Sequence, residues 1–305
     1  MNTIIIINQN SNCLKNFFGR PFLEHVIEAL IERYINEIHL FYYEHPDKVL
    51  TIAGNGEKWG STINHHHIEN QNLSEFIKLN INTKEMTLMV NPDYIVKPDY
   101  KHVNFQKGFN TLFFYKNYDW LSKSYTGWGL FTPDLFQKLF FNDLDDLNNK
   151  LCYRDNITEV VTDLLSIVSY KDWLDSANKI LRNKSGIILK CRETENGIFK
   201  GRNVSIGKKS IINAPVYLGD NTVIGSGTVI GPFASIGKNC RIDDNTIIKN
   251  SLIESNSYIG RSLNIQDSVI DDNRIVNTEL ASEVEIKDEF YISNFLYESD
   301  EYQKE

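Results

Sequence analysis

The sequence lacks the features of a membrane, secreted or metal-knuckle protein. No stretch approaches the roughly 18 consecutive apolar residues of a transmembrane helix. The segment Met1 to Asn8 has no basic cluster and only a short apolar run, so we do not expect a signal peptide. We expect a cytoplasmic location. The cysteines are widely separated, without a C-x-x-C pair, and are expected to be reduced and mostly structural. They are Cys13, Cys152, Cys191 and Cys240.

Basic residues are in deficit. The chain has 40 acidic and 32 basic residues, a formal net charge of −8 and a pI of about 5.5, which argues against a nucleic-acid binder held by phosphate neutralisation. Apolar residues at 41% and charged residues at 24% are ordinary for a globular protein, so a disordered chain is excluded. A length of 305 residues predicts about two domains.

A six-residue repeat dominates the C-terminal half. From Ile206 an aliphatic residue returns every six positions, eight times in one phase, with a small or β-branched residue two positions before it. Glycine often follows the aliphatic residue, and we expect it there because it tolerates the backbone angles of a turn. The phase slips by one residue after Ile248 and again before Ile270. The pattern predicts a solenoid that stacks short strands around an inward aliphatic column.

This repeat resembles the hexapeptide-repeat family, whose fold is a left-handed parallel β-helix, over residues 202–270. Many members are acyltransferases that use a protruding histidine as general base. All seven histidines of this chain precede the repeat, from His25 to His102, so acyl transfer would lack its base. A rigid scaffold that self-associates or docks a partner fits better.

The N-terminal half has an α/β pattern. Thr3–Ile7 predicts a buried strand, Pro21–Tyr34 an amphipathic helix and Glu37–Tyr43 a second strand. A strand, a helix and a strand joined by polar loops are typical of a parallel sheet.

Six segments of this half, in order, resemble sugar-1-phosphate nucleotidylyltransferases. They are residues 19–30 (GRPFLEHVIEAL), 36–40 (NEIHL), 54–60 (GNGEKWG), 87–93 (TLMVNPD), 125–134 (YTGWGLFTPD) and 171–181 (KDWLDSANKIL). The resemblance covers residues 1–182 and implies a Rossmann-like nucleotidyltransferase domain, which in that family is often followed by a hexapeptide β-helix. It also implies that Asp93 matches the aspartate that binds Mg²⁺ and that Gly127 matches the glycine that lies against the sugar.

The groups that neutralise phosphate charge in that family are largely missing. In the family a sugar phosphate attacks a nucleoside triphosphate in line, a step that depends on positioning and charge neutralisation. The glycine-rich loop with its arginine is replaced by residues 8–18 (NQNSNCLKNFF), where Lys15 is the sole cation and the place of the family's lysine falls near Asn12. The second metal ligand should lie just before Ser169, and Asp163 is out of register for it.

Two further motifs have no counterpart. The base-recognition stretch falls on residues 70–79, which contain no glycine, and the sugar-contacting E-K-P is absent from the shortened segment 104–125. We therefore expect a catalytically degenerate nucleotidylyltransferase-like protein that acts as a binding, regulatory or scaffolding subunit in polysaccharide or nucleotide-sugar metabolism. A divergent but active nucleotidylyltransferase and a hexapeptide acyltransferase remain alternatives.

The site predictions follow from the resemblance. Asp93, Gly127 and Trp128 are the expected ligand-binding residues, and Asp93 is the candidate metal ligand. If the chain is active, Asp93 and Lys15 are the catalytic candidates. No cofactor is expected, with Mg²⁺ only for an active enzyme. Self-association or a protein partner on the β-helix and a possible sugar nucleotide are the expected partners, without nucleic acid or membrane insertion.

The domain prediction divides the chain into four parts. A nucleotidyltransferase-like domain is expected over residues 1–183, a linker over 184–201, the β-helix over 202–280 and an acidic aromatic tail over 281–305. We expect the tail to fold over the open end of the β-helix, because an uncovered end exposes strand edges.

Three weaker features have a functional and a structural interpretation. His65, His66 and His67 alternate between the faces of a strand, so at most two converge on a metal. The carboxylates of Asp143, Asp145 and Asp146 are more typical of a solvated helix or loop face than of a cation cluster. Aromatic rings near the expected sugar pocket favour core roles over stacking on a sugar. They are Trp120, Tyr125 and Trp128.

Overall fold

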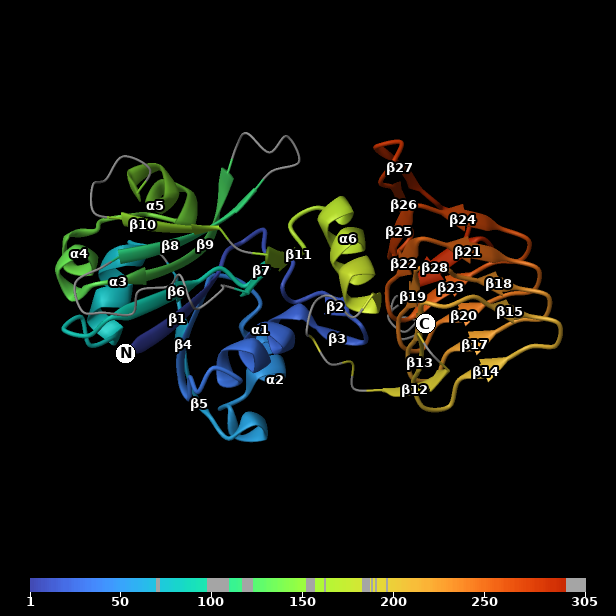
Figure 1. Ribbon diagram of the computed structural model, residues 1–305, viewed down its shortest axis with the longest axis horizontal. Coiled ribbons are helices and arrows are strands. Elements are labelled where there is room, and N and C mark those ends of the chain that lie inside the picture. Colours follow the sequence, from blue (N-terminus) through green and yellow to red (C-terminus); the bar gives the residue numbers. More distant parts are fainter. Residues whose placement is uncertain are drawn as a thin grey trace, which may run out of the picture. The chain divides into compact units, whose positions relative to one another are not determined.

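The chain forms two compact units (Figure 1). The computed structural model describes residues 1–69, 72–97, 110–116, 123–151, 157–161, 163–182, 187, 189, 191–195 and 197–294. Unit 1 comprises Met1–Leu14 and Pro21–Val168, and unit 2 comprises Lys15–Arg20 and Ser169–Glu305. This division differs from the boundary expected at residue 183, because helix α6 (Tyr170–Leu181) packs against strands of the β-helix.

Unit 1 is an α/β domain around a seven-stranded sheet with the order β10-β8-β9-β6-β1-β4-β5. The strands of the sheet are β1 (Asn2–Ile7), β4 (Glu37–Tyr42), β5 (Thr62–His67), β6 (Thr87–Val90), β8 (Asn110–Lys116), β9 (Lys123–Phe131) and β10 (Ile157–Val161). Strand β1 pairs in parallel with β4 and β6, and β9 runs antiparallel to β6 and β8. The expected parallel α/β arrangement is confirmed.

The remaining elements of unit 1 surround this sheet. The helices are α1 (Phe22–Ile31), α2 (Pro46–Ala53), η1 (Glu57–Trp59), α3 (Leu73–Asn80), α4 (Pro133–Lys138) and α5 (Leu144–Leu151). Strands β7 (Tyr94–Lys97) and β11 (Asp163–Ser166) form a separate antiparallel pair. Two short paired strands precede α1 in the chain, β2 (Asn16–Phe17), which belongs to unit 2, and β3 (Arg20–Pro21), which lies at the boundary between the units.

The first strand and helix carry the core of unit 1. All six residues of β1 are buried, and α1 buries its predicted face of Leu23, Val26, Ile27 and Leu30. The helix ends at Ile31, earlier than the expected Tyr34. It ends there because the backbone tightens into bonds between residues three apart and Tyr34 adopts a φ of +62°.

Unit 2 contains a parallel β-helix with three sheets. Their orders are β12-β13-β16-β19-β22-β25-β26-β27, β14-β17-β20-β23-β28 and β15-β18-β21-β24. The strands are β12 (Arg192–Glu195), β13 (Ile198–Lys200), β14 (Ser205–Ile206), β15 (Ile211–Ile212), β16 (Val216–Leu218), β17 (Val223–Ile224), β18 (Val229–Ile230), β19 (Ala234–Ile236), β20 (Arg241–Ile242), β21 (Ile247–Lys249), β22 (Ser251–Ile253), β23 (Ser257–Ile259), β24 (Asn264–Gln266), β25 (Ser268–Asp271), β26 (Arg274–Asn277), β27 (Ser282–Glu285) and β28 (Ile292–Asn294).

The register of these strands confirms the repeat. Ile206 pairs in parallel with Ile224, which pairs with Ile242, so one coil takes 18 residues and contains three six-residue units. The inward aliphatic residues form one buried column from Val216 to Ile270. The first phase slip shortens one coil at the corner between Lys249 and Ser251, where Asn250 alone makes the turn. The arrangement agrees with the expected left-handed parallel β-helix.

Asparagine, and not the repeated glycine, supplies the left-handed backbone at one corner of the coils. Asn203, Asn221, Asn239 and Asn256 have φ between +55° and +66°, and each side-chain amide donates to the next one over 2.9 to 3.1 Å. The glycines after the inward residues have another role. A Cβ on Gly219 would lie 2.6 Å from the backbone of Gly237 in the next coil. The expected turn angle is found at Gly231, which has a φ of +90°, whereas Gly207, Gly219, Gly225 and Gly237 have no positive φ and are required by the close stacking of the coils.

The end of the β-helix is covered by the segment after Ile270. Strand β28 pairs antiparallel with β23, and β26 and β27 extend the eight-stranded sheet. This agrees with the expected cap as far as Asn294, and the rest of the tail lies outside the described residues. Within the described parts of the chain, the helices are too short or too polar to cross a membrane.

Candidate functional site

The segment after β1 closes on Asp93. The Ser11 hydroxyl donates to Asp93 Oδ1 over 2.7 Å, and the backbone N–H groups of Asn12 and Cys13 also bond to this carboxylate. Asn91 fixes the turn from the other side, since its Oδ1 accepts from the Asp93 N–H at 3.1 Å. The loop donors therefore point at a carboxylate of the protein itself.

The environment of Asp93 favours its protonated form. Burial raises the pKa of Asp93 to about 6, although the bonds from Ser11, Asn12 and Cys13 act in the opposite direction. Near neutral pH the carboxylate is mostly ionised, and its charge is held by three donors of one loop.

Asn12 stands near the place of the family's lysine, and the segment just before Ser169 stands where the family has its second metal ligand. The two contact each other without a charged group. The Asn12 side-chain amide donates to the carbonyl oxygens of Ile167 at 3.0 Å and Val168 at 3.3 Å. Asp163 lies at the other end of the β7–β11 pair, opposite Lys97, whereas Tyr94 beside Asp93 is opposite Ser166. Asp163 is thus about 10 Å along its strand from Ser166, out of register as expected.

The Asp93 region does not by itself fit a Mg²⁺ site. Mg²⁺ prefers an octahedron of oxygen ligands, usually with one or two carboxylates. Among the described residues, the one group of three neighbouring metal-ligand side chains consists of Glu254, Asp271 and Asp272, which does not include Asp93. Asp93 is a lone carboxylate already occupied by loop donors.

Gly127 and Trp128 pack on the same turn as Asp93. A Cβ on Gly127 would lie 2.5 Å from the Cβ of Asn91, and Gly127 has a φ of +73°, so glycine is required here by packing. Trp128 is 3% exposed, and its indole N–H donates to the carbonyls of Asn91 and Tyr94 at 3.0 and 3.1 Å. The ring thus has the core role that the sequence favours, and it holds the turn in place. A ligand contact at Gly127, Trp128 or Asp93 stays a prediction.

Lys15 belongs to unit 2. Its ammonium group forms an ion pair with Asp271 and lies 5.7 Å from the ring centre of Tyr170 and 5.6 Å from that of Trp173. Asp271 also accepts from the Tyr170 hydroxyl at 2.6 Å and pairs with Arg274 at 3.4 Å. Lys15 is thus paired with a buried carboxylate of unit 2, and its catalytic role in an active enzyme stays a prediction.

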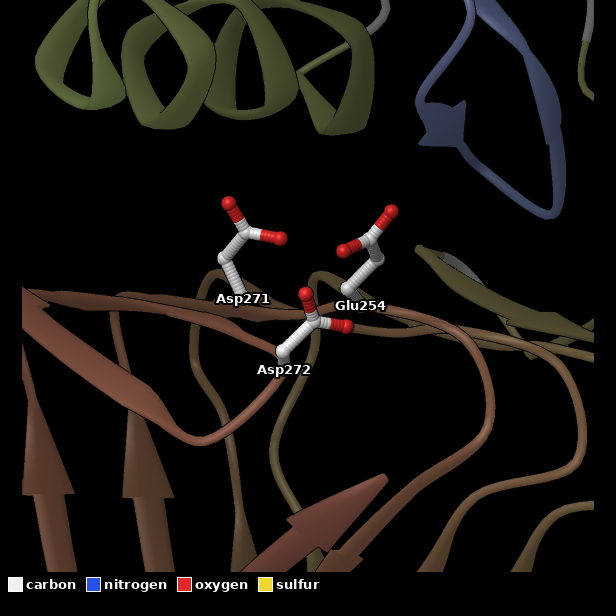
Figure 2. A group of neighbouring side chains, drawn as sticks. All are labelled: Glu254, Asp271 and Asp272. Atoms are coloured by element: carbon white, nitrogen blue, oxygen red, sulfur yellow. The ribbon is translucent and has the colours of Figure 1, made fainter. Parts of the chain in front are cut away.

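Glu254 and Asp272 lie beside this ion pair (Figure 2). One oxygen from each of Glu254, Asp271 and Asp272 falls within 4.8 Å of the others. Burial, and then the hydrogen bond and charge of Asp271, raise the pKa of Glu254, so Glu254 is protonated and donates to Asp271. Burial alone would raise the pKa of Asp271, but the bonds from Glu254, Lys15 and Tyr170 lower it. Lys15 therefore balances one ionised carboxylate.

The histidine run in β5 alternates as expected. The His65 and His67 rings bond to the carbonyls of Gly54 at 2.6 Å and Tyr43 at 3.1 Å. The His66 ring Nε2 lies 3.0 Å from Nδ1 of His39, and burial followed by the His39 charge lowers the pKa of His66 to about 4. His66 is therefore neutral near pH 7. The strand that carries the three histidines pairs with β4.

The other candidates have structural surroundings. Asp143 accepts from the Asp146 N–H at 2.7 Å, and Asp146 pairs with Lys150 at 2.8 Å, which is the solvated helix start that the sequence favours. The Asp145 side chain lies outside the described part of the structure, as do Trp120 and Cys152. Tyr125 packs against the core of unit 1. Cys13 and Cys240 are buried free thiols, as expected, and Cys191 is a half-buried one.

Comparison with known proteins matches the C-terminal unit to a family. An α/β domain joined to a hexapeptide β-helix is the class that the fold defines. Residues 196–297, or 102 of the 305 residues, match the family described as "GMPPB C-terminal domain". The match covers about a third of the chain and lies within the residues of unit 2.

The other comparisons add little. A crystal structure described as a glucose-1-phosphate thymidylyltransferase from Bacillus anthracis, in complex with a sucrose, has 14% sequence identity and a TM-score of 0.48. The likeness covers 64% of this chain and 98% of that chain. None of the curated proteins matches the chain.

The residues that define the site were only partly accessible from the sequence. Asp93, Gly127 and Trp128 do meet at one turn, together with Asn91. The role of Ser11 as the donor to Asp93 was missed, and its position in the replaced loop was the only available indication. Asp271 as the partner of Lys15 had no indication at all, because 256 residues separate the two.

Proposed function

We propose that the chain is a catalytically degenerate sugar nucleotidylyltransferase-like protein that acts as a binding, regulatory or scaffolding subunit in polysaccharide or nucleotide-sugar metabolism. The family match and the motif order support the nucleotidylyltransferase-like class. The pathway comes from the resemblance alone.

The observation that carries the proposed loss of catalysis is the bonding of the loop after β1 to Asp93. Phosphoryl transfer needs backbone N–H groups and cations directed at the phosphates. Here the N–H groups of Asn12 and Cys13 and the Ser11 hydroxyl bond to Asp93, and Lys15 pairs with Asp271. A triphosphate at this loop would meet an anionic carboxylate and no described cation of the loop itself.

A second observation supports a neutral, structural role for the same region. Asn12 joins the loop to the chain after β11 through two carbonyl groups. An amide in this contact holds the backbone in place without contributing charge. The loop thus keeps its structural connections and lacks the charge that the chemistry needs.

The proposal is tested by a thermal-shift screen of the full chain. The ligands are nucleoside triphosphates, nucleotide sugars and sugar phosphates, each with and without Mg²⁺. Binding at about 100 times the dissociation constant stabilises a fold by about 2.7 kcal/mol, which gives a readable shift. We expect no Mg²⁺-dependent stabilisation by a triphosphate. Such a shift, lost in Asp93→Ala, would contradict the proposal and favour a divergent active enzyme, whereas a shift with a nucleotide sugar alone would identify a sensor.

A further inference from the structure

Two histidine rings from neighbouring strands meet at one edge of the sheet of unit 1. Strand β5 is the last strand of the seven-stranded sheet, and it pairs in parallel with β4 (Figure 1). Nδ1 of His39 in β4 lies 3.0 Å from Nε2 of His66 in β5. The two rings are stacked at an interplanar angle of 12°, with 5.2 Å between their centres. Two imidazole nitrogens from separate strands thus face each other.

The separation of these two nitrogens suits a shared metal ion. A transition metal binds imidazole nitrogen at about 2.0 to 2.1 Å, so two neighbouring nitrogen ligands at roughly 90° to 109° lie about 2.9 to 3.4 Å apart. The observed 3.0 Å falls within this range. The same distance also suits the hydrogen bond that the two rings share without a metal. Binding an ion therefore requires the rings to turn and does not require the strands to separate.

Each ring also has a polar partner besides the other ring. Oε1 of Glu37 lies 3.8 Å from Nε2 of His39, and the Asn80 side chain forms a hydrogen bond with the His66 ring. The Asn80 amide nitrogen donates to the Phe76 carbonyl at 2.8 Å, which leaves the amide oxygen to accept from His66. Histidines that bind metals usually donate their other ring N–H to such an oxygen, which fixes the ring and its tautomer.

The proton of the bond between the rings has a place to go. It can move to the far nitrogen of the same ring, beside Glu37 for His39 or beside Asn80 for His66. Both facing nitrogens then present lone pairs while both rings stay neutral. A metal ion can thus replace the shared proton without a net loss of protons from the pair.

The pair is held in place and is still open to solvent. The ring of Phe41 stacks on His66, with 4.4 Å between the ring centres and an angle of 17°. The His39 side chain is 14% exposed, and His66 is partly exposed. Among the described residues, no third histidine, cysteine or carboxylate comes close enough to form a group of three with this pair. Water would therefore fill the remaining positions around an ion.

We propose that His39 and His66 form a binding site for a divalent first-row transition-metal ion, with water at its other positions. Two neutral imidazoles suit Zn²⁺, Ni²⁺ or Cu²⁺, whereas Mg²⁺ and Ca²⁺ prefer oxygen ligands. The bound ion joins the edge strand β5 to β4. The site shares no residue with the turn around Asp93, so it does not depend on the proposed loss of catalysis.

The site is tested by calorimetric titration of the full chain with Ni²⁺, after treatment with a chelator. Ni²⁺ is the probe because thiolates favour Zn²⁺ and Cu⁺, which the cysteines of the chain could bind. We expect saturable binding of one Ni²⁺ per chain. His66→Phe keeps a ring against Phe41 and removes the nitrogens, and His39→Phe removes the other ligand. Each is expected to weaken binding by about tenfold or more, because even the loss of an outer partner has an effect of that size.

The matched control is His67→Phe in the same strand. The His67 ring bonds to the Tyr43 carbonyl and stacks near the Tyr42 ring, so we expect this variant to bind Ni²⁺ like the wild type. A second measurement is the melting temperature, which Ni²⁺ should raise in the wild type and in His67→Phe but not in His39→Phe. The site is refuted by absence of saturable binding to the wild type, by wild-type affinity in His39→Phe or His66→Phe, or by an equal loss in His67→Phe.

Discussion

The Ser11 hydroxyl donates to Asp93 Oδ1 over 2.7 Å across 82 residues of sequence. This bond joins the loop after β1 to the turn that follows β6. It gives Asp93 a protein partner at the place where the resemblance expects a metal ion. The contact is therefore the centre of our account of unit 1, and it can be examined through the protonation of Asp93.

Substitution of Asp93 by Asn is expected to change how stability depends on pH. The folded pKa of about 6 lies above the usual value near 4, so the wild type loses stability as pH rises from about 4 through 6. The loss is at most about 3 kcal/mol, and Asn does not titrate. The free energy of unfolding of Asp93→Asn relative to the wild type should therefore rise over this window. Urea denaturation at about pH 4 and about pH 7.5 measures the difference, and a constant or falling difference would contradict the assignment.

Loss of the Lys15 charge is expected to destabilise unit 2. Lys15→Met leaves Asp271, which is 2% exposed, without its ammonium partner. Removing one member of a buried pair costs about 3 kcal/mol. The matched control is Lys58→Met, which breaks the partly exposed pair with Glu24 and is expected to cost less than about 1 kcal/mol. Chemical denaturation of both variants is the measurement, and equal losses would argue against a structural role for Lys15.

The protonated state of Glu254 predicts a second pH dependence. The pKa of Glu254 is raised from 4.5 to about 9 in the folded protein, so its contribution to stability is complete below pH 4.5 and is lost as pH rises through 9. Glu254→Gln keeps an N–H donor for Asp271 and does not titrate. Its melting temperature relative to the wild type should therefore increase across this range. Parallel melting curves for the two proteins would show that Glu254 is ionised throughout.

The hydrogen-bonded asparagines at one corner of the coils predict that glycine destabilises the fold less than alanine does, which reverses the usual order. Asn239 has a φ of +55°, accepts from Asn221 at 3.0 Å and donates to Asn256 at 2.9 Å. Both substitutions remove these bonds, but alanine adds left-handed strain of about 1 kcal/mol that glycine avoids. Asn239→Gly should thus be the more stable variant by denaturation. At Lys238, which has no positive φ, alanine should be the more stable, and the same order at both positions would refute the backbone argument.

Much of the fold follows from periodicity. The six-residue repeat predicted the coils because each inward position, such as Ile224 or Ile242, depends on a local pattern that the chain repeats. The α/β half was accessible for a similar reason, since β1 is a continuous apolar run and α1 has one apolar face. The stacking role of most of the repeated glycines and the left-handed asparagines at one corner were not predicted, because contacts between coils are not visible within one repeat.

The geometry of the candidate site could be predicted from the sequence only in part. The resemblance located Asp93, Gly127 and Trp128 together, but the direction of the Trp128 ring depends on two carbonyls that no pattern encodes. The missing charges of the loop were visible as absent residue types. What replaced them was not visible, because Asn12, Ser11 and Lys15 find their partners far away in the sequence. Polar contacts of this kind are set by tertiary packing.

The measurement that tests the central claim most directly is release of pyrophosphate. The full chain is incubated with each nucleoside triphosphate and a set of sugar 1-phosphates in the presence of Mg²⁺, beside Asp93→Ala. Because the loop donors are bound to Asp93 and Lys15 is bound to Asp271, we predict no release above the Asp93→Ala background for any pair of substrates. Metal-dependent release by the wild type that Asp93→Ala abolishes would contradict the account and identify an active nucleotidylyltransferase.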